Sequence, residues 1–197
     1  MQKSHRSGAV ATLARAFHDD PLFTFLVPDQ LSRARAALTF MASILADASQ
    51  FQEVWITQAE EAIAGVAAWL PPGAYPRGPR REAMGVLRDL RSAHRLGRRV
   101  LAGMRIYGAV DQAHAQVPEP HWYLAVIGTD PPSQGRGVGS SLLAPVLERA
   151  DREGVSAYLE TQKIENVSWY RHHGFDVVQE LHVRGCPQLW TMSREPK

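Results

Sequence analysis

A glycine-rich loop is the stretch whose residue types and spacing point most directly to chemistry. Residues 134–139 read Gln-Gly-Arg-Gly-Val-Gly and stand between an apolar run at 123–127 and an amphipathic stretch. Glycine lets the backbone come close to a ligand, and the free N–H groups and dipole at the start of a helix attract anions. The pattern therefore predicts a strand, a backbone-exposing loop and a helix start that together bind a pyrophosphate.

The spacing within this loop separates it from other phosphate-binding loops. A Walker A loop needs G-x-x-x-x-G-K-[ST], and no lysine lies between residues 123 and 154. The dinucleotide fingerprint G-x-G-x-x-G also fails, because its third glycine would fall on Ser140 or Leu142. The pattern that fits is Q-x-x-G-x-G, at Gln134, Gly137 and Gly139.

Other candidate chemical groups lie on both sides of the loop. Tyr170 follows Asn166 by four residues, so both side chains project from one face of a predicted helix. Glu160 lies near the end of a predicted strand at 156–161. The single cysteine, Cys186, belongs to no metal-binding spacing, and no grouping of histidine, aspartate and cysteine predicts a metal site.

These motifs resemble the GNAT superfamily of N-acetyltransferases, whose coenzyme A loop has the Q-x-x-G-x-G pattern. The similarity runs through residues 119–192, including Y-L-E-T at 158–161 and N-V-S-W-Y-R-H-H-G-F at 166–175. Within the superfamily, the sequence most closely resembles puromycin N-acetyltransferase and related bacterial enzymes. They share the Glu119-Pro120 entry, the Gly128-x-x-Pro131 step, LET on the next strand, and the asparagine four residues before tyrosine.

The resemblance implies a fold. It predicts one α/β domain over residues 1–197, with a mixed central β-sheet flanked by helices. Residues 119–192 are expected to form the acetyl-CoA-binding core, and the N-terminal half is expected to face the acceptor. GNAT chains usually open with a strand, and only about eight residues precede the first predicted helix here, so that strand is expected to be short or missing.

The resemblance also implies residue roles, with acetyl-CoA as co-substrate. The pantetheine arm is expected alongside Ile127, Gly128 and Thr129, and a strand N–H there would polarise the thioester carbonyl. Asn166 would contact the cofactor arm, and Tyr170 would be the general acid for the coenzyme A thiolate. Backbone N–H groups of the loop would hold the pyrophosphate, from Gln134, Gly135, Arg136, Gly137, Val138, Gly139 and Ser140.

Acetyl transfer to an amine also needs a base that removes a proton from the ammonium group. Glu160 is the favoured candidate, acting directly or through water with a raised pKa. His121 and His114 are the alternatives. The predicted reaction is acetylation of a primary amine on a small molecule, with an aminonucleoside or amine antibiotic as the suggested subclass. Protein or peptide N-acetylation and a non-catalytic coenzyme A sensor are the alternative functions.

The periodicity of apolar residues predicts the elements that position these groups. Besides the central strand at 123–127, predicted strands occupy 53–57, 62–70, 156–161, 175–183 and 188–192. Predicted helices occupy about 10–17, 32–48 and 166–173, and a further helix follows the glycine loop and ends at about 153. Ser32 is expected to cap the second helix, with Leu38, Met41 and Leu45 on its inner face. Phe23, Phe25, Trp55, Trp69 and Trp122 are candidates for the lining of an apolar acceptor pocket, with the core as the alternative.

Composition narrows the class of protein. The chain has 197 residues, of which 45% are hydrophobic and 21% charged, and a net charge of +2, which gives no global signal for nucleic-acid binding. Nine arginines and two acidic residues fall within 77–105, where Leu101 and Met104 help to suggest amphipathic helices. This segment reads as a solvated basic face, as an attractor of coenzyme A phosphates or an acidic acceptor, or more weakly as a single-strand nucleic-acid contact.

Targeting signals are not evident in the sequence. No apolar run approaches the roughly 18 residues of a membrane span, and the start is too charged for a secretion signal. A cytoplasmic protein without a membrane partner is the expectation. Homodimers are common among similar proteins, which keeps a homodimer open here.

Overall fold

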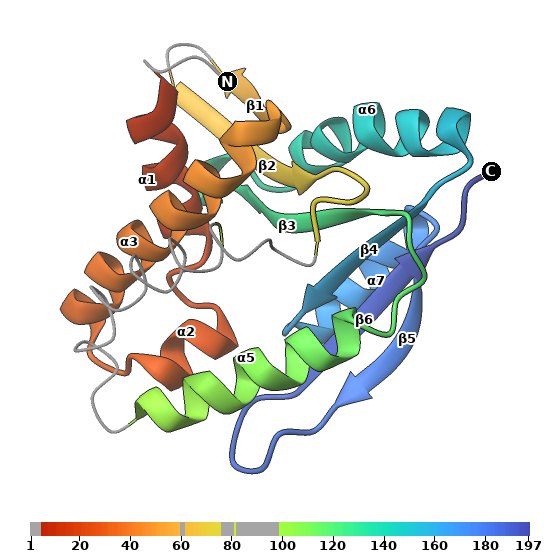
Figure 1. The fold of residues 1–197 in the computed structure, drawn as a ribbon. Coiled ribbons are helices and arrows are strands. Elements are labelled where there is room, and N and C mark those ends of the chain that lie inside the picture. The colour runs from red at the N-terminus through yellow and green to blue at the C-terminus, as the bar shows by residue number, and fades with distance from the viewer. Residues whose placement is uncertain (1–4, 60–61, 76–80, 82–98) are drawn as a thin grey trace.

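A mixed β-sheet organises the fold (Figure 1). The computed structural model describes residues 5–59, 62–75, 81 and 99–197. In this part of the chain six strands pair in the order β1-β2-β3-β4-β6-β5, with β3 and β4 parallel and the other neighbours antiparallel. The strands are β1 (Val54–Ala59), β2 (Ala62–Leu70), β3 (His121–Thr129), β4 (Ser156–Thr161), β5 (Asp176–Leu181) and β6 (Leu189–Arg194).

Helices cover both faces of this sheet. They are α1 (Arg6–Ala16), α2 (Pro21–Leu26), α3 (Gln30–Ala48), α5 (Val100–His114), α6 (Val138–Glu153) and α7 (Ile164–His172). Figure 1 shows α1 and α3 beside the first strands, α6 across their other face, and α5 running past the second half of the sheet. The predicted α/β fold with a mixed sheet flanked by helices is confirmed.

Strand β2 shows why the sheet has two apolar faces. Its sequence, AIAGVAAWL, is almost continuously apolar and almost continuously buried. Ala67 and Trp69 pack into the core that includes α6 and α7, whereas Val66, Ala68 and Leu70 pack into the core that includes α1 and α3. The alternation of side chains along one strand therefore supplies both cores.

Helix α3 differs from its prediction in where it starts and in which residues form its buried face. It begins at Gln30, because the carboxylate of Asp29 accepts the N–H of Ser32 and serves as the N-cap in place of Ser32. Met41 and Leu45 are buried as predicted, but Leu38 is 42% exposed. The buried row Ala37, Met41 and Leu45 advances by four residues, which leaves Leu38 on the flank of the helix.

Other helices differ from their predictions by a few residues at an end or in the face that is buried. Helix α7 begins at Ile164, two residues before Asn166. Helix α5 exposes Leu101 and Met104 and buries Ile106 and Ala113 instead. The other predicted helix positions of the arginine-rich segment, at 76–80 and 82–98, lie outside the described residues. The helix that follows the glycine loop ends at Glu153, as predicted.

The sequence predicts that the opening strand of the family is short or missing. From residue 5 onward the chain starts with helix α1, and its first strand among the described residues is β1, after α3. No helix in the described ranges combines the length and the apolar character that a membrane crossing needs.

The sheet splits between β3 and β4, and this split positions the site. The two strands pair only from His121, Trp122 and Tyr123 to residues 156–158, and then separate. On the other edge of β3, the register with β2 shifts between Ala68 and Trp69, so Ala125 is an extra residue on β3. Such a bulge bends a strand, here at the point where β3 leaves β4.

Candidate active site

The glycine loop leads into α6 and leaves the start of this helix without a side-chain cap. Gly135 and Gly137 have φ values of 73° and 78°, in the region that glycine adopts at no steric cost. Gly137 is the N-cap of α6 and provides no side chain to occupy the first N–H groups of the helix. Those N–H groups, at Val138, Gly139 and Ser140, remain available to an anion.

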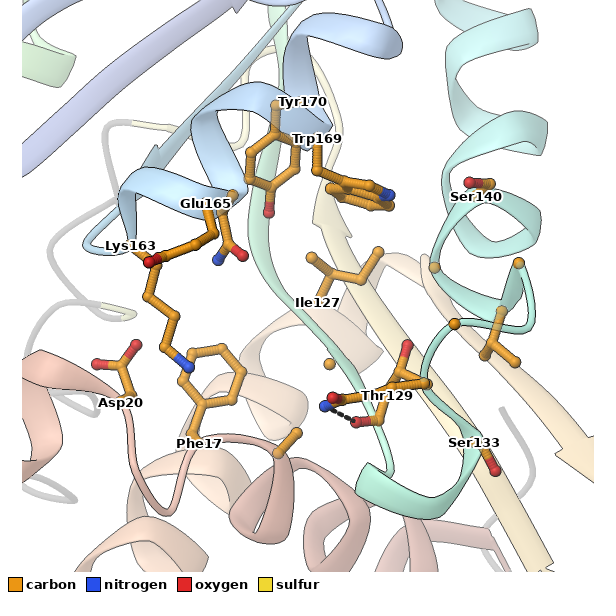
Figure 2. A pocket seen from close by; sticks show the side chains of 18 of the residues that line it. Phe17, Asp20, Ile127, Thr129, Ser133, Ser140, Lys163, Glu165, Trp169 and Tyr170 are labelled. Carbon is orange, nitrogen blue, oxygen red and sulfur yellow. Dashed lines mark hydrogen bonds between the residues drawn. The ribbon is translucent and has the colours of Figure 1, made fainter.

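This helix end borders a cavity of about 860 Å³ (Figure 2). The cavity runs from the loop to α7 and α1, and it contains most of the predicted cofactor-binding residues. Those that line it are Ile127, Gly128, Thr129, Gln134, Gly135, Gly137, Val138, Gly139, Ser140 and Asn166. Arg136 is exposed and is not among the lining residues, so the cavity does not include this predicted contact.

The backbone of β3 presents hydrogen-bonding groups to the split in the sheet. The N–H of Asp130 donates to the carbonyl of Ala64 on β2 at 2.8 Å. Backbone direction alternates along an extended strand, so the N–H and C=O groups of Ile127 and Thr129 face away from β2 and toward the cavity. The side chain of Gln134 donates to the Thr129 carbonyl at 3.3 Å, which ties the loop to the strand end.

A second cavity, of about 320 Å³, continues from the first on the other side of the split. Its lining is largely apolar and includes Phe23, Phe40 and Tyr107, together with Glu160. Five residues line both cavities: Phe17, Asp20, Ile127, Asn166 and Tyr170. A group bound in one cavity can therefore meet a group bound in the other at this junction.

Most of the aromatic residues predicted for an acceptor pocket lie elsewhere. Trp69 and Trp122 are fully buried in the core shared with α6 and α7. Trp55 on β1 and Phe25 on α2 are in neither cavity lining, which leaves Phe23 as the one prediction in this set that lines a cavity.

Tyr170 occupies the junction itself. Its ring packs against Trp169 and Phe175, and its hydroxyl group points into the cavity (Figure 2). Burial raises the pKa of the Tyr170 hydroxyl above its ordinary value, which keeps its proton in place near pH 7. Asn166 lies one helical turn earlier on α7, and its amide donates to Thr161 Oγ1 at 3.3 Å.

Glu160 enters the second cavity from β4. Burial raises the pKa of its carboxyl group to about 7, although the hydroxyl of Tyr123 donates to Oε2 at 2.9 Å and favours the charged form. A carboxylate with this pKa takes up and releases protons near neutral pH. His114 and His121, the alternative bases, are buried and line neither cavity.

The described fold and both cavities agree with the match of this sequence to a protein-family model. The model of the Acetyltransferase (GNAT) family matches residues 16–175, which is most of the chain. The chain belongs to the GNAT family. It is therefore an N-acetyltransferase, and the family implies the use of acetyl-CoA. The finer resemblance to puromycin N-acetyltransferase stays a prediction.

Individual proteins also align over nearly the full chain. An uncharacterized N-acetyltransferase, C550.08, from Schizosaccharomyces pombe is 26% identical over 96% of this chain and 79% of its own. The crystal structure of histone acetyltransferase HPA2 and related acetyltransferase from Corynebacterium glutamicum has a TM-score of 0.65 at 20% identity, covering 100% of this chain and 94% of that one. Drosophila melanogaster polyamine N-acetyltransferase, which forms N-acetylagmatine, has a TM-score of 0.64 at 15% identity, covering 99% and 97%.

Several residues of this GNAT site were not predicted from the sequence. Asp20, Phe17 and Lys163 line the first cavity, and His173 Nε2 contacts Ser140 Oγ at 2.9 Å. Asp20 had a local signal, because an Asp-Pro pair at 20–21 is typical of a helix N-cap, but that signal does not reveal a cavity. Among the described residues of the GNAT domain, no group of three or more histidines, cysteines or acids is arranged to hold a metal ion.

Proposed function

We propose that this GNAT enzyme transfers an acetyl group from acetyl-CoA to a primary amine of a small molecule, with both substrates bound at once. The observation that carries the proposal is the junction at which Tyr170 and Ile127 line both cavities. One cavity has the groups to hold a pyrophosphate and an extended arm. The other is smaller, is mainly apolar, and contains the carboxyl group of Glu160 among its few charged side chains.

The first cavity fits acetyl-CoA. The uncapped N–H groups at the start of α6 suit the pyrophosphate, and the inward-facing backbone of Ile127 and Thr129 suits the amides of the pantetheine arm. At position 139 a Cβ would lie 2.9 Å from Trp169 Cζ2, so glycine keeps this end of the cradle open. When bound, acetyl-CoA supplies the activated acetyl thioester. The chain supplies orientation, a proton acceptor and a proton donor.

The second cavity receives the acceptor amine in this proposal. Glu160 removes a proton from the ammonium group, directly or through one water, and leaves an electron pair on nitrogen for the attack. A backbone N–H at Ile127 or Thr129 stabilises charge that develops on the acetyl oxygen. Tyr170, placed between the cavities, donates its proton to the departing thiolate.

The size and lining of the second cavity favour a small amine over a protein segment. About 320 Å³ lined by phenylalanine, leucine and isoleucine side chains suits an amine with an apolar body. The Drosophila neighbour is named for polyamine acetylation, which is consistent with a small acceptor. An aminonucleoside or amine antibiotic remains the subclass that the sequence resemblance favours.

Thiol release from acetyl-CoA tests this proposal. The panel contains puromycin, an aminoglycoside, agmatine, an arylalkylamine, an amino acid and a peptide N-terminus. We expect release that depends on one class of small amine. Release with the peptide alone would overturn the proposal in favour of protein acetylation. Binding of acetyl-CoA, measured as thermal stabilisation in the same buffer, controls for a folded and competent cofactor site.

A further inference from the structure

A buried pair of histidines lies behind Glu160, on the side away from the cavity. His114, at the end of α5, is 2% exposed, and His121, at the start of β3, is 3% exposed. The His114 ring stacks on Tyr75 with centroids 3.6 Å apart and an interplanar angle of 3°. The rings of Tyr123 and Tyr158 lie 4.4 and 4.6 Å from it. The imidazole of His114 is therefore held in one orientation.

The hydrogen bonds of this pair fix the positions of its protons. The carbonyl of Pro118 can only accept, so Nδ1 of His121, at 3.0 Å, carries a hydrogen. In neutral His121, Nε2 is then an acceptor. Nε2 of His114 lies 2.8 Å from it and must be the donor. Neutral His114 therefore presents the lone pair of Nδ1, on the opposite side of its ring.

That lone pair faces the carboxyl group of Glu160. His114 Nδ1 is 3.8 Å from Glu160 Oε1. Oε2 accepts a hydrogen bond from Tyr123, whereas Oε1 is buried and has no hydrogen bond of normal geometry with the described residues. The buried hydroxyl of Tyr158 also interacts with this carboxyl group and favours its charged form. A charged Oε1 would face the electron-rich Nδ1. A proton placed between the two atoms turns this repulsion into a hydrogen bond, for which Nδ1 and Oε1 must move about 1 Å closer together.

We propose that His114 and His121 are positioning residues that make Glu160 and His114 share the proton removed from the acceptor, a role that rests on the proposed function. The ammonium N–H bond breaks, a bond forms between the proton and Glu160, and the electron pair stays on the amine nitrogen. The proton is then held between Oε1 and His114 Nδ1. It returns through Glu160 to water in the cavity after the product leaves.

His121 acts only by fixing the tautomer. His121 Nε2 accepts a hydrogen bond from His114 Nε2–H, so the nitrogen of His114 that can accept a hydrogen bond is Nδ1, which faces Glu160. Glu119 Oε1 lies 3.4 Å from His121 Nδ1 and is partly exposed. Tyr75, which stacks on His114, donates its hydroxyl proton to Asp111. Among the described residues, the titratable and charged groups around the pair include Glu160, Tyr75, Asp111, Glu119, Tyr123 and Tyr158.

Nitrogen-15 NMR of the full-length enzyme tests the tautomers without any assay of activity. Histidine is labelled with ¹⁵N, and the single variants His114→Asn and His121→Phe assign the signals. We expect neutral His114 to carry its proton on Nε2 and neutral His121 to carry its proton on Nδ1. Finding the proton of His121 on Nε2, or that of His114 on Nδ1, would overturn the proposal even if acetyl transfer is confirmed.

The pH profile of kcat/KM tests the consequence for catalysis. In His114→Asn an amide near the position of Nδ1 can donate to Oε1 and favours the charged carboxylate, so we expect the midpoint to fall by about one unit or more. His121→Phe should also move the midpoint, because His114 is then no longer held in one tautomer. His121→Gln, whose carbonyl can accept from His114 Nε2, should restore it.

A purely structural role predicts a different result. In that case His114→Asn and His121→Phe would lower activity and thermal stability equally at every pH, with the midpoint unchanged, and the proposal would be wrong. If the wild-type enzyme acetylates none of the amines, the proposed function fails, and the NMR result still decides the proton positions.

Discussion

A Cβ at position 139 would lie 2.9 Å from Cζ2 of Trp169, closer than side chains pack. The ring of Trp169 on α7 can lie this close to the start of α6 because residue 139 is glycine. We expect Gly139→Ala to destabilise the protein by about 1–3 kcal/mol and to raise the KM for acetyl-CoA, because Trp169 must move. Gly108→Ala, at an open position on α5, is the matched control and should be neutral or stabilising by up to about 1 kcal/mol. Equal effects at both positions would contradict this account.

Tyr170→Phe removes the hydroxyl and keeps the ring that packs on Trp169 and Phe175. We expect kcat to fall by about 10²–10⁴-fold, the usual contribution of a positioned general acid, while the affinity for acetyl-CoA stays the same. Turnover and calorimetric titration of the cofactor measure the two quantities. Full activity in the variant would eliminate Tyr170 as the proton donor.

Asp20 offers a charge at the junction of the cavities. Its carboxylate caps α2 and lines both cavities, and burial raises its pKa above the ordinary value. Asn can cap the helix equally well, so Asp20→Asn should keep the fold. We expect the KM for the amine to rise about tenfold through the loss of charge, equivalent to about 1.4 kcal/mol. Asp29→Asn, at the exposed cap of α3, is the control and should leave the KM unchanged.

The raised pKa of Glu160 predicts the pH dependence of catalysis. A base must be deprotonated to act, so kcat/KM should rise with pH through a midpoint of about 7. Glu160→Gln cannot take up the proton, and its activity should fall by about 10²–10⁴-fold and lose this step. Ionisation of the amine also contributes to the profile, so the ratio of the two enzymes on the same substrate is the quantity to compare. A wild-type step that survives in Glu160→Gln would assign the base elsewhere.

The same carboxyl group predicts the pH dependence of stability. The folded protein binds this proton more tightly than the unfolded chain, whose Glu160 has a pKa near 4.5, so the protonated group stabilises the fold at low pH. This contribution is lost as pH rises through about 7. We expect Glu160→Gln to gain about 1–3 kcal/mol relative to wild type between pH 5 and pH 8, as measured by urea unfolding. A constant difference over that range would contradict the raised pKa.

The parts of the molecule that were predictable from sequence depend on local patterns. The glycine loop, the helix that follows it and the strand at 156–161 are specified by residues adjacent in the chain, and they lie where the pattern places them. The prediction that Leu38 is buried was wrong, because an amphipathic pattern allows several rows of apolar residues to face the core. Contacts with α1 and the sheet select the row through Met41.

Most of the surroundings of Glu160 had no local signal in the sequence. Tyr158 interacts with Glu160 from the same strand, but the hydrogen bond and the ion-pair contact of Glu160 come from Tyr123 on β3 and His114 on α5, which are 37 and 46 residues away in the chain. Both histidines were candidates as bases in their own right, because their type suggested proton transfer and their burial was not predictable. Only the three-dimensional arrangement separates a group that lines the cavity from a group that stands behind it.

The extra residue Ala125 on β3 has a consequence for how this sequence can change over evolutionary time. Alternation along the strand gives Ile127 and Thr129 their cavity-facing backbone, and the bulge resets that alternation just before them. The loss or gain of one codon between Leu124 and Ile127 would turn the backbone groups of Ile127 and Thr129 toward β2, regardless of which side chains the strand carries. In homologous genes we therefore expect this strand to accept many replacements but to keep a constant length up to the Pro131 turn.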